Sequence, residues 1–186
     1  MLRAQMPRSV DDRFPAVLDA ARRGDRDAIS DLYLRFNPSL VRFLEGRSGA
    51  GADLAQDTWI AVFASLASFE GNDRQFRSWL FTIARRRVVD HWRRVGRQPV
   101  ATHAPAQVAA VTARDTAGDE LIARDAIAEL VRDLSAEQAD VVLLRVVAGL
   151  SVEEVADIIG KSSGAIRVIQ HRALRRLAAI QTGETS

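Results

Sequence analysis

The stretch SVEEVADIIGKSSGAIRVIQHRALRRL, residues 151–177, decides how the second half of the chain folds. Ser151 followed three residues later by Glu154 fits a capping box at the start of a helix. Gly160 suits the left-handed residue that ends such a helix. Helical spacing of apolar residues resumes near Ser162 or Ser163, where we predict that a longer helix starts. A short capped helix, a tight turn and a second helix predict a helix-turn-helix.

The last of these helices has two chemically different faces. At 100° per residue, its apolar side collects Ile166, Ile169, Ala173, Leu177 and Ile180. The opposite side carries Val168, His171, Arg172 and Arg175, with Arg167 at its edge. From Lys161 to Leu177 the sequence has basic residues and no acidic residue. Arginine neutralises phosphates and reads guanine edges in the major groove, so this face favours DNA binding. The alternative is an amphipathic helix with a solvated basic face.

The overall composition predicts a soluble, foldable protein. The chain has 186 residues, of which 47% are hydrophobic and 27% are charged. Its formal net charge is only +2, so a surface for polyanions must come from local clustering. It has no cysteine, which excludes disulfides, cysteine-bound zinc and thiol nucleophiles. We find no signal peptide and no membrane-spanning run, so we expect a cytoplasmic protein without membrane insertion.

Helical periodicity divides the chain into two parts. Apolar stripes and two further helices, at about 52–68 and 75–95, make up the first part. Residues 98–118 contain two prolines and few large apolar groups, which is typical of a linker. We therefore predict an all-α fold with two small helical domains, 9–97 and 119–181, joined by a flexible linker at 98–118. Ser135 and Gln138 predict a second capping box.

The helix in ADLAQDTWIAVFASLASFEG, residues 52–71, is apolar on two opposite sides. One side is an ordinary core stripe: Leu54, Thr58, Ala61, Val62, Ser65 and Phe69. The other carries Gln56, Trp59, Ile60 and Phe63, flanked by Asp53 and Asp57. A helix of this kind either lies inside its own domain or binds a partner. A lobe of four helices has limited interior to cover both sides, but periodicity leaves both readings open.

The next helix, in FRSWLFTIARRRVVDHWRRVGR, residues 76–97, combines aromatic residues with arginines. It holds seven arginines against one acid, Asp90, and it includes Trp79, Phe81 and Trp92. This combination suits single-stranded nucleic acid, whose bases stack and whose phosphates are neutralised. The arginines are scattered around the helix, so the spacing assigns no single DNA-facing side. A buried aromatic helix with a basic solvent rim remains the alternative.

Three blocks of the sequence, in this order, resemble a bacterial RNA polymerase sigma factor of the extracytoplasmic-function (ECF) type. The blocks are ADLAQDTW, SFEGNDRQFRSWLFTIARRRVVDHWRR and LSAEQADVVLLRVVAGLSVEEVADIIGKSSGAIRVIQHRALRRL. The resemblance covers about Phe14 to Leu177. It implies a sigma-two domain, a linker and a sigma-four domain. It also implies a transcription initiation factor that binds core RNA polymerase and promoter DNA and that has no catalytic residue, cofactor or metal.

The resemblance implies roles for three groups of residues. The core-polymerase-binding group, which would meet the clamp helices, is Asp53, Gln56, Asp57, Trp59 and Phe63. The group that would hold the single-stranded minus-ten element is Ser65, Phe69, Asn72, Arg85, Arg86 and Arg93, and Ser65, Phe69 and Arg86 would line the pocket of a flipped base. The group that would read the double-stranded minus-thirty-five element is Ser162, Ala165, Arg167, Val168, His171 and Arg172. Family members are often held inactive by an anti-sigma factor, so a partner of this kind is expected.

Two other classes of function compete with this interpretation. A helix-turn-helix regulator would bind a palindromic operator as a dimer, independently of core polymerase. An enzyme is disfavoured, because the sequence has no glycine-rich phosphate loop and no paired-carboxylate or nucleophile motif. The three histidines, His91, His103 and His171, are far apart in sequence.

Overall fold

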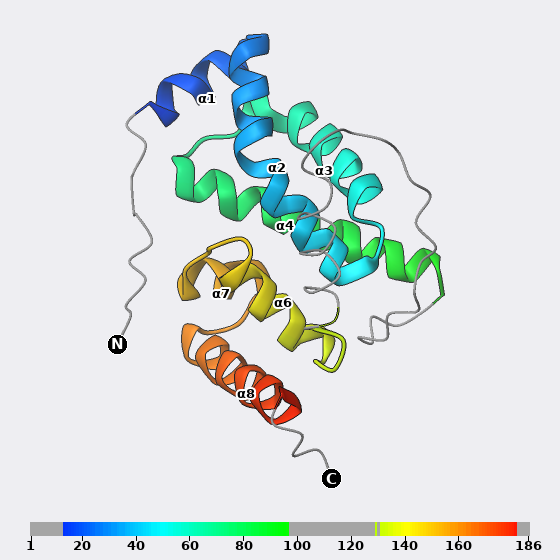
Figure 1. The fold of residues 1–186 in the computed structure, drawn as a ribbon. Coiled ribbons are helices and arrows are strands. Elements are labelled where there is room, and N and C mark those ends of the chain that lie inside the picture. Colours follow the sequence, from blue (N-terminus) through cyan, green and yellow to red (C-terminus); the bar gives the residue numbers. More distant parts are fainter. Residues whose placement is uncertain (1–12, 97–128, 130, 182–186) are drawn as a thin grey trace.

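The computed structural model describes residues 13–96, 129 and 131–181, and every regular element in these ranges is a helix (Figure 1). This confirms the predicted all-α class. The linker predicted at 98–118 lies outside the described residues, as do residues 9–12, 97, 119–128 and 130 of the two predicted domains. Within the described ranges, no helix combines the length and apolar character that crossing a membrane requires. The elements in chain order are α1 (Phe14–Arg22), α2 (Arg26–Ser48), α3 (Gly51–Ser65), the 3₁₀ turn η1 (Leu66–Ser68), α4 (Asp73–Arg94), α6 (Ala136–Val146), α7 (Val152–Ile159) and α8 (Ser163–Gln181).

Local capping chemistry sets several of these boundaries. Both capping boxes expected from the sequence are confirmed: the Ser135 hydroxyl accepts from the Gln138 amide at 3.3 Å, and the Ser151 hydroxyl accepts from the Glu154 amide at 3.2 Å. Gly160 ends α7 with a φ of 77°, as predicted. Each cap satisfies amides or carbonyls that a helix end would otherwise leave without partners. The helix-turn-helix α7–α8 is therefore fixed at both ends of its first helix.

Helices α1–α4 form the first lobe, whose core combines leucines with several buried phenylalanines. Phe14 and Phe36 meet edge to face with their ring centroids 6.3 Å apart, and Phe36 lies 5.2 Å from Phe76. Phe43 and Phe81 form a second edge-to-face pair at 5.5 Å. Such aromatic pairs add to the stabilisation gained from burying their surface. They bind α1 and α2 to α4 and so position α4 across the lobe.

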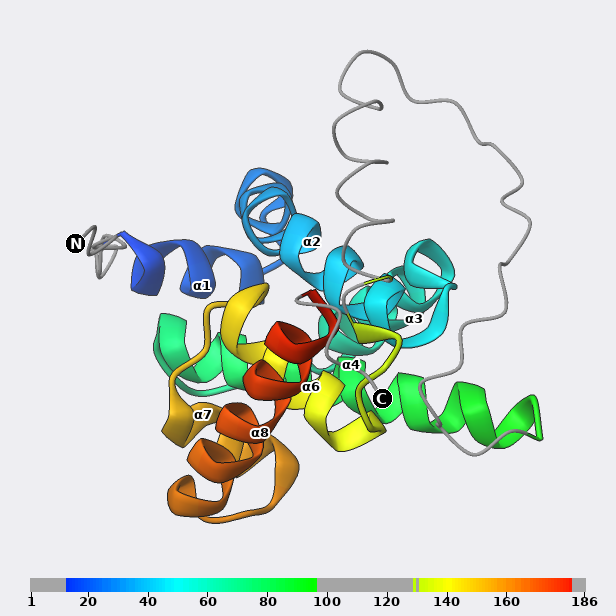
Figure 2. The same ribbon diagram turned by 60° about the horizontal axis from the view of Figure 1, so that its bottom comes forward.

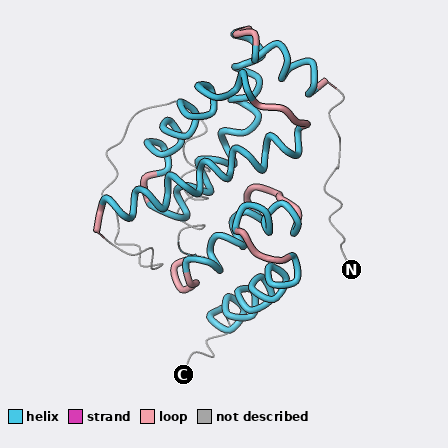
Figure 3. The backbone as a smooth tube through the Cα atoms, turned by 180° about the vertical axis from the view of Figure 1, so that it is seen from behind, coloured by secondary structure: helices cyan, strands magenta, loops and turns pink. Residues whose placement is uncertain are grey.

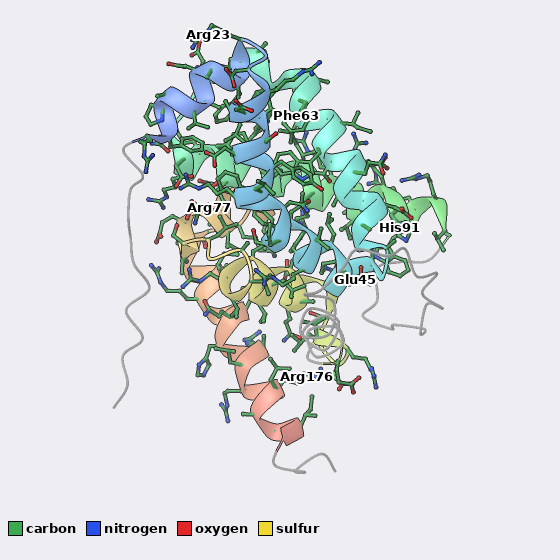
Figure 4. All side chains as sticks on the ribbon, turned by 45° about the horizontal axis from the view of Figure 1, so that its top comes forward. Arg23, Glu45, Phe63, Arg77, His91 and Arg176 are labelled. Carbon is green, nitrogen blue, oxygen red and sulfur yellow. The ribbon has the colours of Figure 1, made fainter. Side chains whose placement is uncertain are left out.

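The corner between α2 and α3 depends on one close approach. The N-cap residue of α3, Ala50, offers no side-chain acceptor, and the Glu45 carboxylate of α2 accepts from the Gly51 amide at 2.6 Å instead (Figure 4). A Cβ atom at position 51 would lie 2.3 Å from that carboxylate oxygen. A larger residue where α3 begins would therefore displace the Glu45 carboxylate from the Gly51 amide that it caps.

Helices α6–α8 and residues 131–135 form the second lobe. Ile166 and Ala173 of α8 are buried against this lobe, as the predicted apolar face requires. Arg145 of α6 donates from Nε to Gln170 Oε1 at 3.3 Å and also donates to the Leu150 carbonyl. This arginine therefore ties α8 to α6 and to the loop before α7.

The two lobes pack directly against each other, which the sequence does not predict. Helix α6 lies beside α2, and α7 lies beside α4, so that α6 and α7 separate α8 from the first lobe (Figures 1 and 3). Figure 2 shows the lobes from a second direction, with α2 at the top and with α7 and the start of α8 at the bottom. The basic face of α8 is therefore left outside the contact between the lobes.

Candidate protein-docking groove and nucleic-acid interface

A groove of about 510 Å³ runs between α2 and α3 in the first lobe. Two large apolar side chains of its lining are well exposed: Ile60 is 60% exposed and Tyr33 is 41% exposed. Exposed apolar side chains around a hollow are typical of a protein-binding surface. The groove is lined by Tyr33, Asn37, Val41, Ala52, Ala55, Gln56, Trp59, Ile60 and Phe63.

Trp59 forms the inner part of this groove rather than its exposed rim. Its side chain is only 3% exposed, and its indole stacks on Phe63 at 5.1 Å and lies 5.3 Å from the Tyr33 ring. The indole N–H donates to Asn37 Oδ1 at 3.0 Å. Phe63 is half-buried on α3 beside α2 (Figure 4). The apolar side that we inferred for α3 is therefore partly covered by α2, and a partner would contact Ile60 and Tyr33 more fully than Trp59.

The polar residues of the predicted docking group lie in the open. Asp53, Gln56 and Asp57 are all exposed on α3. Of these three residues, Gln56 also lines the groove. Sequence reasoning placed Ile60 on this side without including it among the site residues, and it missed Tyr33. Tyr33 directly follows Leu32 of the α2 core stripe, so only the packing of α2 on α3 brings its ring into the groove.

The turn between α3 and α4 brings together three residues of the predicted minus-ten group. Ser65 donates its hydroxyl to the Ala61 carbonyl at 2.6 Å, and Asn72 caps α4 by accepting from the Gln75 amide at 3.0 Å. Phe69 is half-buried in this turn. The Asn72 side chain is therefore already used in capping α4, and the Ser65 hydroxyl is used within α3.

The ring of Phe69 has a partner that the sequence analysis did not identify. It stacks on Trp79 with centroids 4.7 Å apart and planes at 24°, and the Arg22 guanidinium lies 6.0 Å from its centroid. Stacked rings beside an arginine offer the kind of surface on which bases stack. Arg22 belongs to α1, so its place here follows only from the packing of α1 on this turn.

The predicted arginines of α4 lie well away from that turn. Thirteen residues separate Asp73, the first residue of α4, from Arg86, which corresponds to about 20 Å along a helix axis. Arg86 is exposed, and Arg93 approaches Asp90 at 3.5 Å on the surface. The structure therefore does not bring Arg86 into one pocket with Ser65 and Phe69. Arg85 differs from both, because its Nε donates to Asp140 of the second lobe at 2.9 Å.

The predicted reading face of α8 is open to solvent along most of its length. Arg167, His171 and Arg172 are exposed, and Val168 is 50% exposed. Ala165 is half-buried near the helix start. These residues project from the side opposite Ile166 and Ala173, as the helical wheel predicted. Ser162 is also exposed, and its hydroxyl accepts from the Ala165 amide at 3.2 Å.

One arginine of the reading face is engaged by an acid of α7. Arg167 donates to Glu153 Oε1 at 3.2 Å, and both side chains are more than half exposed. The pKa of Glu153 is lowered, first by a hydrogen bond from the backbone and also by the positive charge of Arg167. An exposed pair of this kind is weak, so Glu153 can hold Arg167 in place without preventing it from turning to DNA.

Among the described residues, no group of three or more histidine, aspartate or glutamate side chains is placed to hold a metal ion. Within the same described residues, the groove and the basic face of α8 leave apolar and polar groups exposed. Both can bind a macromolecule.

Comparison with known proteins identifies the two lobes. The family model "Sigma-70 region 2" matches residues 31–98, and the model "Sigma-70, region 4" matches residues 130–179. The chain is 35% identical over 178 residues to the ECF RNA polymerase sigma factor SigD of Mycobacterium tuberculosis, covering 89% of this chain and 82% of SigD. It is 33% identical over 178 residues to the ECF RNA polymerase sigma factor ShbA of Streptomyces griseus, covering 89% of this chain and 93% of ShbA.

The fold is also similar to that of a solved sigma factor. The sigma factor RpoE of Bartonella quintana, solved in complex with the anti-sigma factor NepR, aligns with a TM-score of 0.61 and 26% identity. The alignment covers 82% of this chain and 96% of RpoE. The helical lobes, the helix-turn-helix and these matches lead to one conclusion: the chain belongs to the ECF family of RNA polymerase sigma factors, which are not enzymes but transcription initiation factors that direct core RNA polymerase to promoters.

Proposed function

We propose that the groove between α2 and α3 is the surface through which this sigma factor binds core RNA polymerase. The observation that carries the proposal is the pair of exposed apolar side chains, Ile60 and Tyr33, at the rim of a groove in a lobe that already has a complete core. Asp53 and Asp57 lie exposed on the same helix. An apolar groove with acids beside it suits a helical partner that carries apolar and basic residues.

The second part of the proposal concerns promoter DNA. Helix α8 enters the major groove of the minus-thirty-five element, where Arg167 and Arg172 contact base edges or phosphates. The turn between α3 and α4 holds the unpaired non-template strand of the minus-ten element, with Phe69 as the stacking surface. The arginines of α4 neutralise its phosphates. Unstacking a base costs a few kcal/mol. An aromatic surface on which that base can stack therefore helps to offset the free-energy cost of melting the promoter.

The factor acts in the cytoplasm, where its polymerase is, and an anti-sigma protein holds it inactive. Support for such a partner comes from the relative RpoE, which was solved with the anti-sigma factor NepR. A dimeric regulator that works without polymerase is the weaker alternative, because the chain matches sigma-factor regions in both lobes.

Gel filtration with purified core polymerase tests the docking surface. We expect Ile60→Glu to weaken co-elution and run-off transcription at least about tenfold, because it places a charge in the apolar centre of the contact. Ile60 is 60% exposed, so the variant should keep its fold. The matched control is Leu34→Glu, on α2 and 72% exposed but outside the lining of the groove.

Two outcomes of these binding experiments would contradict the proposal. If Ile60→Glu co-elutes and transcribes as the wild type does, the groove is not the docking surface. If the free protein binds a palindromic operator as a dimer and never co-elutes with polymerase, the regulator alternative replaces the proposal.

A further inference from the structure

We propose that Arg22 of α1 reads the base that the minus-ten turn captures, through two hydrogen bonds from one edge of its guanidinium. Such a pair of bonds selects a base that offers two neighbouring acceptors. Guanine offers O6 and N7, and an unpaired cytosine offers N3 and O2, whereas adenine and thymine place a donor next to each acceptor. The inference rests on the proposed function, because it requires a base of the non-template strand to stack at Phe69.

A base held at Phe69 finds no free polar partner among the other residues predicted for that pocket. The Ser65 hydroxyl donates to the Ala61 carbonyl, and the Asn72 side chain caps α4. Arg86 lies about 20 Å along α4 from the turn. Stacking on an aromatic ring accepts every base, so reading the base requires another polar side chain beside the ring.

Arg22 has two donors that are not in use. Its Nη1 donates to Asp19 Oδ1 at 3.1 Å, but its Nε and Nη2 are buried without a hydrogen-bond partner. Among the residues that the structure describes, no other side chain has two buried donors in this state. The Nε and Nη2 hydrogens lie on the same edge of the planar guanidinium and form the fork that binds two neighbouring acceptors. Buried donors without partners are rare in folded proteins, and here they point to a ligand.

The aromatic cluster of the turn places this edge next to a captured base. The Arg22 guanidinium carbon lies 6.0 Å from the centroid of the Phe69 ring. Trp79 stacks on that ring at 4.7 Å, and Phe76 meets it edge to face at 5.6 Å. Because stacked rings have centroids about 4.5–7 Å apart, a base on Phe69 would come within hydrogen-bonding reach of Arg22.

The fold holds Arg22 in position before any DNA arrives. Arg22 is the last residue of α1, and the chain turns directly after it at Gly24, whose φ is 85°. The Gly24 amide donates to the Ala21 carbonyl at 3.0 Å, and the Asp25 amide donates to the Ala20 carbonyl at 3.1 Å. The Arg22 side chain is only 24% exposed. A side chain that is already ordered loses little conformational entropy on binding.

The turn covers both donors in the free chain, so a base must displace part of this cover. The tip of the Phe69 ring packs at Gly71, where a Cβ atom would lie 2.8 Å from Phe69 Cζ. Displacing the cover exchanges two unpaired donors for two hydrogen bonds, which favours the bound state. A phosphate would also fit the fork. The burial of the donors beside aromatic rings favours a base, because a phosphate loses more hydration on burial.

The first test measures which base each variant prefers. Holoenzyme transcribes a promoter whose minus-ten positions are randomised, and the transcribed templates are sequenced. In wild type, one position should prefer guanine or cytosine at least about tenfold, as expected of a bidentate contact. Arg22→Ala should reduce that preference below about threefold and leave the other positions unchanged. Arg22→Lys should do the same, because lysine keeps the charge but lacks the planar fork.

The matched control is Arg23→Ala, which removes the neighbouring exposed arginine at the end of α1 (Figure 4). It should keep the wild-type preference at every position. An unchanged preference in Arg22→Ala would overturn the inference. An equal loss of transcription on all templates would overturn it as well, because Arg22 would then contact a phosphate or serve only the fold.

The second test changes the base instead of the protein. A fork-junction promoter carries 7-deazaguanine or 3-deazacytosine at the preferred position, so that the base lacks one of its two acceptors. Wild-type holoenzyme should bind this DNA at least about fivefold less tightly than the natural sequence. Arg22→Ala holoenzyme should show a difference below about twofold, because the interaction is already absent. Equal losses in the two proteins would show that Arg22 does not contact that acceptor.

The inference and the proposed function fail in different ways. Phe69→Ala should weaken the preference at the same promoter position as Arg22→Ala. If Phe69→Ala has this effect and Arg22→Ala does not, Phe69 captures the base and another group reads it. If Phe69→Ala changes no position, the stacking surface of the proposed function is itself wrong.

Discussion

Helices α4 and α8 are both rich in arginine, yet they hold their arginines in different surroundings. On α8, Arg172, Arg175 and Arg176 are all exposed; Figure 4 labels Arg176 on this helix. On α4, Arg77 pairs with Asp73, and Arg85 pairs with Asp140. Two arginines of α4 are thus held in ion pairs, whereas three arginines of α8 are open to solvent.

The difference follows from how many sides of each helix are covered. Helix α8 packs on α6 and α7 and faces solvent beyond them, so its polar residues collect on one side. Helix α4 packs on α2 and α3 and also meets α7 of the second lobe. Its arginines emerge at the borders of these contacts, where acids of neighbouring elements can reach them. A scattered pattern of arginines on a helix can therefore indicate a helix covered from more than one direction.

The largest effect should come from the buried side of α4. Phe81 is fully buried against Phe43, so Phe81→Ala should lower the free energy of unfolding of the first lobe by about 3–5 kcal/mol. Val168→Ala on the open face of α8 should change the stability by less than about 0.5 kcal/mol. Urea denaturation followed by circular dichroism measures both. Equal losses for the two variants would contradict the assignment of covered and open sides.

An intermediate effect is expected on the open face of α8. Arg167→Ala should lose about 1–3 kcal/mol of discrimination between the cognate minus-thirty-five element and a mutated one. Competition binding by holoenzyme on the two promoters measures this difference. The matched control is Arg176→Ala, an exposed arginine of the same helix outside the predicted reading group. If both variants lose affinity equally on both promoters, Arg167 contacts phosphate rather than bases.

The smallest effect concerns the pair that restrains Arg167. Glu153→Gln removes the charge that faces Arg167, and we expect holoenzyme to bind its promoter less than about twofold more tightly, because exposed pairs are weak. The folded-state pKa of Glu153 is lowered, so the stabilisation is complete above the ordinary pKa of glutamate. It is lost as the pH falls through the lowered pKa. An NMR titration of the Glu153 carboxyl in wild type and in Arg167→Ala checks the contribution of Arg167, which should make the midpoint lower in wild type.

Local chemistry and periodicity were enough to predict the helix-turn-helix. The capping boxes at Ser135 and Ser151 and the glycine at 160 involve residues three to nine positions apart. The two faces of α8 depend only on the spacing within one helix. These features could be predicted because no distant residue alters them.

The features that could not be predicted all depend on distant residues. Trp59 looked available on the helical wheel of α3, but Tyr33 and Asn37 of α2 cover it. The partner of Arg85 is Asp140, 55 positions later in the chain. A wheel describes one helix at a time, so it cannot show that another helix shields a side chain or that another lobe neutralises a charge.

The glycine at the start of α3 has a consequence for how the docking surface could diversify. Gly51 lies at the junction of α2 and α3, where a side chain would displace the Glu45 carboxylate that accepts from the Gly51 amide. A substitution at this junction would disturb the corner that relates the two walls of the groove, while every residue that a partner touches stays the same. Two sigma factors with the same contact residues could thus differ in how well they compete for polymerase, because of this backbone corner alone. A comparison restricted to the residues that contact the partner would not detect the difference.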